Sequence, residues 1–256
     1  MISSAALRTQ IEAALAAREF TVFRAPAPAR RPAIPTGIAS LDRLLNGGFP
    51  VGAICEVTGA ESSGRTTLTL SFLARVMQGG DVCAWIDVGD TLDPESAAAL
   101  GIDLARLLWV RCQDTGTGYS RRKPWSRLDQ ALRAADLVLQ AGGFSAIVFD
   151  MGCVAHEHAL RVPLASWFRF RQAAQRTQST FLLLTQDACA KSCASVLLKI
   201  ERRTASTDSS TVLEGLQFQA TLLRQRNHAG FDAMGKKPPA SDPAAWKNRM
   251  PWAGER

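Results

Sequence analysis

The segment from Thr58 to Thr67 combines two glycines with hydroxyl and cationic side chains at a spacing suited to holding phosphate. In the pattern G-x-x-x-x-G-K-[ST], backbone amides surround phosphate groups, a lysine reaches them and a hydroxyl holds magnesium. The segment therefore predicts a nucleotide-binding loop. Its binding residues are Gly59, Ala60, Glu61, Ser62, Ser63, Gly64, Arg65, Thr66 and Thr67.

The loop departs from this pattern at one position, where Arg65 replaces the lysine. Arginine keeps the positive charge but presents a wide planar fork in place of a compact ammonium group. We expect a loop of this kind to bind a nucleotide and to place its phosphates differently.

A second chemical signal is the apolar run from Phe144 to Phe149, which ends in Asp150. Nucleotide sites use a carboxylate at such a strand end to hold the magnesium shell from the side opposite the loop. We expect Asp150 to share Mg²⁺ with the Thr66 hydroxyl. ATP and Mg²⁺ are the cofactors that this pair of signals predicts.

Alternating apolar runs and amphipathic segments predict the elements that position these residues. Buried parallel strands joined by helices indicate an α/β fold with a mostly parallel, doubly wound sheet and flanking helices, with ligands at the carboxyl ends of the strands. The predicted strands are 54–58, 82–87, 107–111, 146–150, 180–185, 195–202 and 216–223, and the predicted helices include 65–77, 93–100, one capped by Ser126, and 164–176.

Composition restricts the classes of protein. The 256 residues can bury one sizeable core, and no apolar run approaches the roughly 18–20 residues that span a bilayer. The N-terminus lacks a basic segment followed by an apolar stretch, so we expect a cytoplasmic protein with no membrane association. The net charge of +7 is consistent with a polyanion partner and equally with a solvated basic surface. No CxxC pair occurs, which favours reduced structural cysteines over a zinc site.

Three regions divide the chain in our interpretation. Residues 1–35 form an N-terminal arm, with an amphipathic helix at 5–19 and a linker whose prolines oppose both helix and sheet. Residues 36–230 form the nucleotide-binding core. Residues 231–256 are predicted to be a flexible basic tail, in which Trp246 and Trp252 are candidate anchors for a partner groove.

Beyond these signals, residues 36–112 resemble the ATP-binding core of bacterial RecA recombinases, and the resemblance continues more weakly to about residue 203. It implies a RecA-like P-loop NTPase fold, with Asp93 facing the adenine amino group and Gln186 sensing the γ-phosphate. The matching residues are Thr36-Gly37, Ser40-Leu41-Asp42, Gly47-Gly48, Pro50, Gly52, Glu56, Gly59, Glu61-Ser62-Ser63-Gly64, Thr66-Thr67-Leu68, Ile86-Asp87, Leu92-Asp93-Pro94, Leu100-Gly101, Leu107-Leu108, Asp150 and Thr185-Gln186.

The departures from RecA concern catalysis and DNA binding. Gly89 stands where the family carries the glutamate that activates water, with Asp90 one residue away, and Ser96 replaces an adenine-stacking tyrosine. The two loops that bind DNA in RecA correspond to the short segments 151–163 and 187–192. The resemblance therefore implies nucleotide binding with weak or absent ATP hydrolysis.

A RecA-type core with these departures is similar to ImuA-type proteins, the accessory factors of damage-induced translesion synthesis. This similarity implies DNA repair and an SOS response, with RecA or a Y-family-like polymerase as partner. Arginines such as Arg121, Arg122, Arg169 and Arg171 predict weak contact with single-stranded DNA, and the resemblance to RecA implies self-association through the N-terminal helix. Two alternatives stay open: a divergent DNA-dependent ATPase or recombinase, and a regulatory ATPase outside DNA metabolism.

Overall fold

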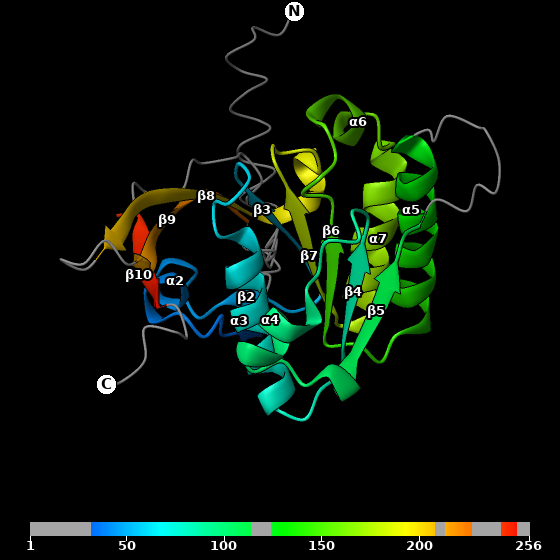
Figure 1. The fold of residues 1–256 in the computed structure, drawn as a ribbon. Helices are drawn as coiled ribbons and strands as arrows, with labels where there is room; N and C mark the ends of the chain where they lie inside the picture. Colours follow the sequence, from blue (N-terminus) through cyan, green and yellow to red (C-terminus); the bar gives the residue numbers. More distant parts are fainter. Residues whose placement is uncertain (1–31, 114–123, 208–212, 227–241, 250–256) are drawn as a thin grey trace, which may run out of the picture. The chain divides into compact units, whose positions relative to one another are not determined.

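The computed structural model describes residues 32–113, 124–207, 213–226 and 242–249. These residues all belong to one compact unit of the chain, which is organised around an eight-stranded sheet in the order β10-β9-β8-β3-β7-β6-β4-β5 (Figure 1). From β8 to β5 every pairing is parallel, whereas β9 and β10 are antiparallel. The predicted mostly parallel sheet is confirmed.

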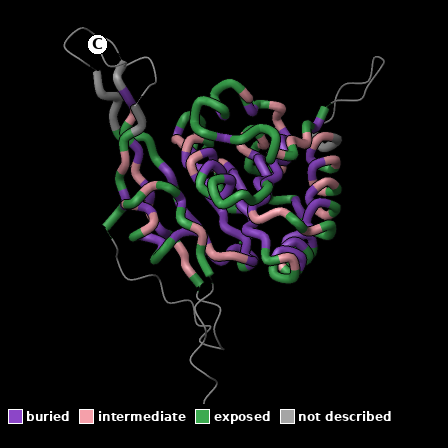
Figure 2. The backbone as a smooth tube through the Cα atoms, turned by 90° about the horizontal axis from the view of Figure 1, so that it is seen from below, coloured by how far each residue is buried: buried purple, intermediate pink, exposed green. Residues whose placement is uncertain are grey.

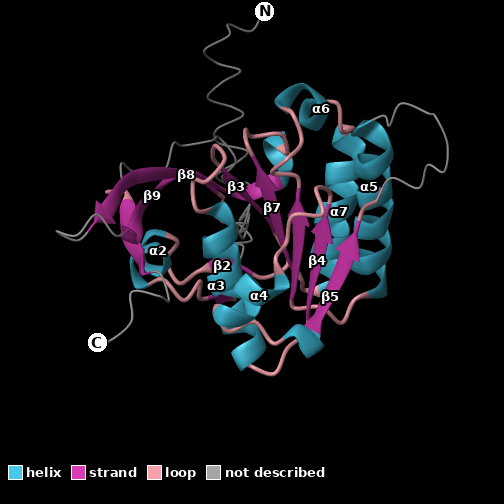
Figure 3. Ribbon diagram, in the orientation of Figure 1, coloured by secondary structure: helices cyan, strands magenta, loops and turns pink. Residues whose placement is uncertain are grey.

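Apolar runs form the centre of this sheet. Every residue of the four central parallel strands is buried, as expected where helices cover both faces. These strands are β3 (Ile54–Thr58), β7 (Thr180–Thr185), β6 (Ala146–Asp150) and β4 (Cys83–Asp87), and β5 (Leu107–Arg111) lies at the edge. Their carboxyl ends all lie at the end of the sheet near α6 (His156–Leu160), as Figure 3 shows.

Helices cover the two faces of the sheet and divide the core into two clusters. One cluster lies under α2 (Ala39–Leu44), α3 (Arg65–Gln78) and α4 (Pro94–Ala99), with Phe49 packed edge-on against Phe72. The other lies under α5 (Pro124–Ala141) and α7 (Leu164–Thr177), around the rings of Phe149, Trp167, Phe170 and Phe181. The purple interior of Figure 2 corresponds to these clusters. Helix α5 begins at Pro124, before the predicted cap Ser126.

The antiparallel side of the sheet is larger than predicted. Strands β8 (Ala194–Thr207) and β9 (Leu213–Gln225) are both longer than the predicted segments. In the predicted tail, β10 (Ala244–Arg249) pairs with β9 and places Trp246 opposite Phe218, with the two rings 5.5 Å apart. Residues 244–249 are therefore part of the fold and not a flexible tail. Trp246 is a packing residue and not a free anchor, whereas Trp252 lies outside the described residues.

The start of the core also differs from the prediction. Strand β1 (Ala33–Ile34) pairs with β2 (Phe49–Pro50), so the end of the predicted linker enters a small sheet. A two-residue pairing needs few backbone donors, which explains how it forms between prolines. The predicted helix at 5–19 lies outside the described residues. Within the described residues, no helix has the length and apolar character needed to cross a membrane.

Candidate nucleotide-binding site

The predicted phosphate loop connects β3 to α3, the arrangement that its motif requires. The Gly59 amide donates to the carbonyl oxygens of Thr185 and Gln186, at 3.2 and 3.1 Å, which fixes the start of the loop to the end of β7. Gly64 adopts a φ of 96° immediately before the helix. The loop therefore opens at the carboxyl end of the sheet, with the free amides of the first turn of α3 beside it.

Both loop glycines are required because other parts of the chain lie close to them. A Cβ atom on Gly59 would lie 2.5 Å from the Ile200 carbonyl oxygen and from Ser63 Oγ. A Cβ atom on Gly64 would lie 2.6 Å from the ring of Phe218 on β9, at a φ that already opposes a side chain. The obstacle at Gly64 is therefore a ring of the protein itself, that of Phe218.

Two polar groups of the loop are buried without a partner. Ser63 is 4% exposed and Arg65 is 9% exposed. Among the described residues, neither Ser63 Oγ nor Arg65 Nη1 has a hydrogen-bond partner. Other buried donors of the fold, such as Trp85 Nε1 and Trp167 Nε1, also lack a partner among the described residues, but Ser63 Oγ and Arg65 Nη1 lie within the predicted phosphate loop. A phosphate group accepts hydrogen bonds from donors of both kinds, so these residues fit a nucleotide phosphate.

The remaining loop residues lie at its surface. Ala60, Glu61, Ser62 and Thr66 are exposed, and Thr67 is partly buried. Ser62 has a φ of 58°, which helps to turn the backbone amides of the loop inward. The structure thus brings together all the predicted loop residues, from Gly59 to Thr67, around the start of α3.

Arg65 extends from the loop toward the end of β6. A Cβ atom on Gly152 would lie 3.1 Å from both Arg65 Nη2 and Asp150 Oδ1, so the guanidinium and the carboxylate flank the same point. Burial lowers the pKa of Arg65, and the charge of Asp150 opposes that shift. Burial raises the pKa of Asp150 to about 6, against the hydrogen bond of 2.9 Å that its Oδ1 accepts from the Gly152 amide.

The surroundings of Asp150 combine a carboxylate with a nearby positive charge. Asp150 Oδ1 accepts the Gly152 amide, and the charge of Arg65, which disfavours a divalent cation nearby, acts on the carboxylate. Thr66, the other predicted magnesium ligand, is exposed at the start of α3. The pair Thr66 and Asp150 stays a prediction.

In the turn after β4, where we expect no catalytic base, three of the four carboxylate oxygens of Asp87 and Asp90 accept hydrogen bonds, and Asp87 Oδ1 is buried without a partner among the described residues. Asp87 Oδ2 accepts hydrogen bonds from the amides of Thr91 and Leu92, at 2.9 Å each, and from Trp109 Nε1 at 3.3 Å. Asp90 forms two hydrogen bonds with the guanidinium of Arg111, at 2.6 and 2.8 Å. Asp90 therefore does not replace the missing glutamate, because its carboxylate is held at Arg111.

Gly89 in this turn is covered by a side chain that sequence reasoning missed. A Cβ atom on Gly89 would lie 2.8 Å from Cys153 Sγ. The Cys153 thiol lies where a longer side chain at position 89 would have to pass. Although the residue as a whole is exposed, partial desolvation of the thiol, and then the charge of Asp150, raise the pKa of Cys153. Only its position three residues after Asp150 could have drawn attention to it.

The two other predicted nucleotide contacts have partners within the fold. Asp93 caps α4 by accepting hydrogen bonds from Glu95 N, Ser96 N and Ser96 Oγ, so its adenine contact stays a prediction. The Gln186 side chain donates to the Gly152 carbonyl oxygen at 3.0 Å. Gln186 thus contacts the same glycine that adjoins Arg65 and Asp150.

The segments in the places of the RecA DNA loops are short and contain helical turns. Residues 151–163 contain α6, and residues 187–192 enter the 3-10 helix η2 (Lys191–Cys193). His156 Nδ1 lies 3.4 Å from Asp187 Oδ2, which adds a second link between these segments beside the Gln186–Gly152 hydrogen bond.

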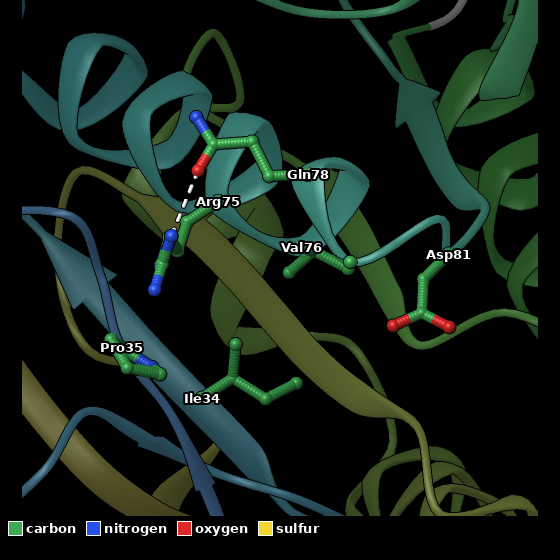
Figure 4. A pocket seen from close by; sticks show the side chains of 7 residues that line it. Ile34, Pro35, Arg75, Val76, Gln78 and Asp81 are labelled. Atoms are coloured by element: carbon green, nitrogen blue, oxygen red, sulfur yellow. Dashed lines mark hydrogen bonds between the residues drawn. The ribbon is translucent and has the colours of Figure 1, made fainter.

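An open pocket of about 400 Å³ lies at the other end of α3, far along the helix from Arg65. Figure 4 shows Arg75 bonded to Gln78, with Asp81 beyond them and the apolar side chains of Ile34 and Pro35 across the opening. None of the predicted nucleotide-binding residues lines it, so we do not assign it to the site.

Fold and loop together define a P-loop α/β protein, and comparison with known proteins narrows this class. The family model for the RecA N-terminal domain matches residues 9–158, and the chain belongs to this family. Protein RecA of Clavibacter michiganensis subsp. michiganensis is 40% identical over 158 residues, which cover 59% of this chain and 40% of that protein. Protein RecA of Francisella philomiragia is 42% identical over 118 residues, which cover 46% of this chain and 29% of that protein. The chain thus matches less than half the length of these relatives.

A solved structure confirms the fold over most of the chain. The crystal structure of the RadB recombinase superposes with a TM-score of 0.57 and covers 86% of this chain and 97% of that one. The two sequences are 18% identical, so this likeness concerns the fold alone.

Proposed function

We propose that this protein is a RecA-family, ATP-binding accessory protein in DNA repair, an adaptor for translesion synthesis with weak or absent ATPase activity. The observation that carries the proposal is a contrast within the site. The phosphate loop has buried donors without partners at Ser63 and Arg65, whereas the turn that would supply a base has Gly89 and an Asp90 held by Arg111.

The weak hydrolysis follows from the absence of a positioned base. A general base typically contributes about 10²–10⁴-fold to a rate, and it must reach the attacking water. Gly89 has no side chain, and Cys153 covers the space beside it. Binding of nucleotide without rapid turnover suits a protein that acts by assembly with a partner.

The proposed partners are RecA, a Y-family-like polymerase, or another copy of this chain bound through the predicted helix at 5–19. Deletion of residues 1–19 should abolish association with RecA-type chains in co-purification. Replacement of Trp252 tests the polymerase partner better than deletion of residues 240–256, because that deletion also removes β10. Retention of every partner by both variants would place the adaptor surface on the core. A cytoplasmic location belongs to the same proposal.

Contact with single-stranded DNA should be weak and made by arginines such as the exposed Arg169 and the half-buried Arg171, together with Arg121 and Arg122 outside the described residues. Phosphate contacts lose affinity with salt, at a slope of about −0.7 per contact on single strands. Tight binding that resists salt would instead support the alternative function, a divergent DNA-dependent ATPase or recombinase.

ATP turnover, measured with and without single-stranded DNA, decides between the two functions. The adaptor predicts turnover at the background rate under both conditions, together with binding of a fluorescent ATP analogue. Turnover that rises strongly on adding DNA would overturn the adaptor and establish the ATPase.

A further inference from the structure

We propose that the Arg65 guanidinium takes the place of the divalent cation in this site, so that nucleotide phosphates bind without Mg²⁺. The inference rests on the proposed nucleotide binding, and it identifies Arg65 as the positive charge that would balance the phosphates. It starts from where Arg65 lies, which its sequence position alone does not reveal.

The first observation is the shared location of the guanidinium and the carboxylate. Arg65 Nη2 and Asp150 Oδ1 each lie 3.1 Å from the point where a Cβ atom on Gly152 would be. Asp150 is the carboxylate that a Mg²⁺ shell would use from the side opposite the loop. Arg65 is thus a positive charge of the protein itself that acts on Asp150, at longer range than a direct ion pair.

The second observation is that Gly152 makes room for this arrangement. Any side chain at position 152 would meet both Arg65 and Asp150. The Gly152 amide also donates to Asp150 Oδ1 at 2.9 Å, which uses one acceptor site of that oxygen. The absence of a side chain at position 152 therefore leaves the guanidinium and the carboxylate on either side of one small space.

The third observation is that Arg65 keeps a free donor for phosphate. Its Nη1 atom is buried without a partner among the described residues, in the same loop as Ser63 Oγ. Arginine stays charged in proteins, and its fork can approach a carboxylate on one edge and a phosphate on the other. One side chain therefore provides both a positive charge that acts on Asp150 and a donor that can meet the phosphate.

A divalent cation at the same place would lie beside a guanidinium as well as a carboxylate. Like charges at short range repel strongly where burial lowers the effective dielectric constant. Lysine at position 65 would leave more space, because an ammonium group is compact and carries no planar fork. The substitution Arg65→Lys should therefore create a dependence on magnesium that the natural protein lacks.

The experiment measures the dissociation constant of the full chain for a fluorescent ATP analogue, in MgCl₂ and in EDTA. For the natural protein we expect the two constants to agree within about threefold, and for Arg65→Lys we expect Mg²⁺ to tighten binding by at least about tenfold, the factor that corresponds to 1.4 kcal/mol. Adding Asp150→Asn to Arg65→Lys should abolish that magnesium effect. The exposed α5 residue Asp129 supplies the matched control Asp129→Asn, which should leave both constants unchanged.

The outcomes separate this inference from the proposed function. Binding by the natural protein that requires Mg²⁺ would overturn the inference and leave nucleotide binding intact. No binding in either buffer would overturn both. If Arg65→Lys does not fold, as judged by thermal unfolding, manganese binding to the natural protein with ATP decides, because a protein-bound Mn²⁺ signal in electron paramagnetic resonance would also contradict the inference.

Discussion

The phosphate loop and the turn after β4 lie at the same end of the sheet, yet their polar groups differ in what they contact. In the loop, Ser63 Oγ and Arg65 Nη1 are buried without partners among the described residues. In the turn, Asp87 Oδ2 accepts three hydrogen bonds and Asp90 is paired with Arg111. Asp87 Oδ1 is also buried without a partner among the described residues, so the two regions differ in the kind of group that they leave free. The loop leaves donors that suit phosphate, whereas the turn leaves one carboxylate oxygen.

This difference teaches that binding and catalysis can separate within one fold. The loop depends on glycines that let β8 and β9 approach it, at Ile200 and Phe218. In the turn, Arg111 lies over the Trp109 ring, 4.8 Å from its centroid, while it holds Asp90. A turn without a base can still support a site that only binds.

The largest effect is expected from Gly64→Ala in the phosphate loop. The new Cβ atom would meet Phe218 at 2.6 Å at a φ of 96°. Overpacking typically costs about 1–3 kcal/mol and a left-handed φ costs about 1–2 kcal/mol, so we expect a loss of about 2–5 kcal/mol of stability. Binding of the ATP analogue should be lost, because the loop must move. Chemical denaturation and fluorescence titration measure the two effects.

Gly143→Ala is the matched control for this change. Gly143 also has a positive φ, of 84°, but nothing lies within 4 Å of its Cβ position. The Gly143→Ala variant should lose only the stability that the left-handed φ costs, about 1–2 kcal/mol, and should bind nucleotide normally. Equal losses in the two variants would show that Phe218 does not restrain the loop.

The second effect concerns the turn, where Gly89→Glu should not restore ATP hydrolysis. The side chain would meet Cys153 Sγ at 2.8 Å, so we expect destabilisation of about 1–3 kcal/mol and no gain in turnover. Adding Cys153→Ala removes that contact. A gain approaching about 10²–10⁴-fold should require Arg65→Lys as well, which returns the phosphate to its usual partner.

Phosphate release assays on the single, double and triple variants test whether hydrolysis needs all three substitutions. Cys153→Ala alone is the control for the loss of the thiol. A large gain in Gly89→Glu alone would show that the turn is more adaptable than the described contacts imply.

Much of this contrast could be predicted from the sequence, because it depends on local patterns. Continuous apolar runs predicted β6 and β7 with the bounds that the structure shows, and the spacing of Gly59 and Gly64 placed the loop between a strand and a helix. The missing base at Gly89 could be recognised from the resemblance to RecA.

The neighbours of the site could not be predicted in the same way. Phe218 lies far along the chain from Gly64, and only the pairing of β9 with β8 brings it to the loop. The direction of Arg65 depends on the space at Gly152. Strand β10 has no independent apolar pattern, and Trp246 gains its packing only when β9 is beside it. These neighbours depend on strand register and on contacts between residues far apart in the sequence, which local patterns do not reveal.

A smaller effect should follow from Trp246→Ala, which removes the ring that packs on Phe218. Trp246 is partly buried against the core, so we expect a loss of about 1–3 kcal/mol, less than the 3–5 kcal/mol typical of a fully buried tryptophan. Nucleotide affinity should fall modestly, because Phe218 then restrains the loop less well. Lys247→Ala, an exposed change on the same strand, is the control. Unchanged stability would mean that the packing of β10 on Phe218 does not support the phosphate loop.

The smallest effect is expected in the turn itself, from Asp90→Asn. Asparagine tolerates the φ of 56° at this position, so the substitution removes mainly the charge that pairs with Arg111. The hydrogen bonds from Arg111 lower the pKa of Asp90, so the contribution of the pair is present above the ordinary carboxyl pKa and is lost as pH falls through the lower folded value. Because such surface pairs contribute about 0.2–1 kcal/mol, the natural protein and Asp90→Asn should differ by that amount at neutral pH and converge in acid. Denaturation curves at several pH values measure this difference, and a gap that widens as pH falls would contradict the assignment of Asp90 to Arg111.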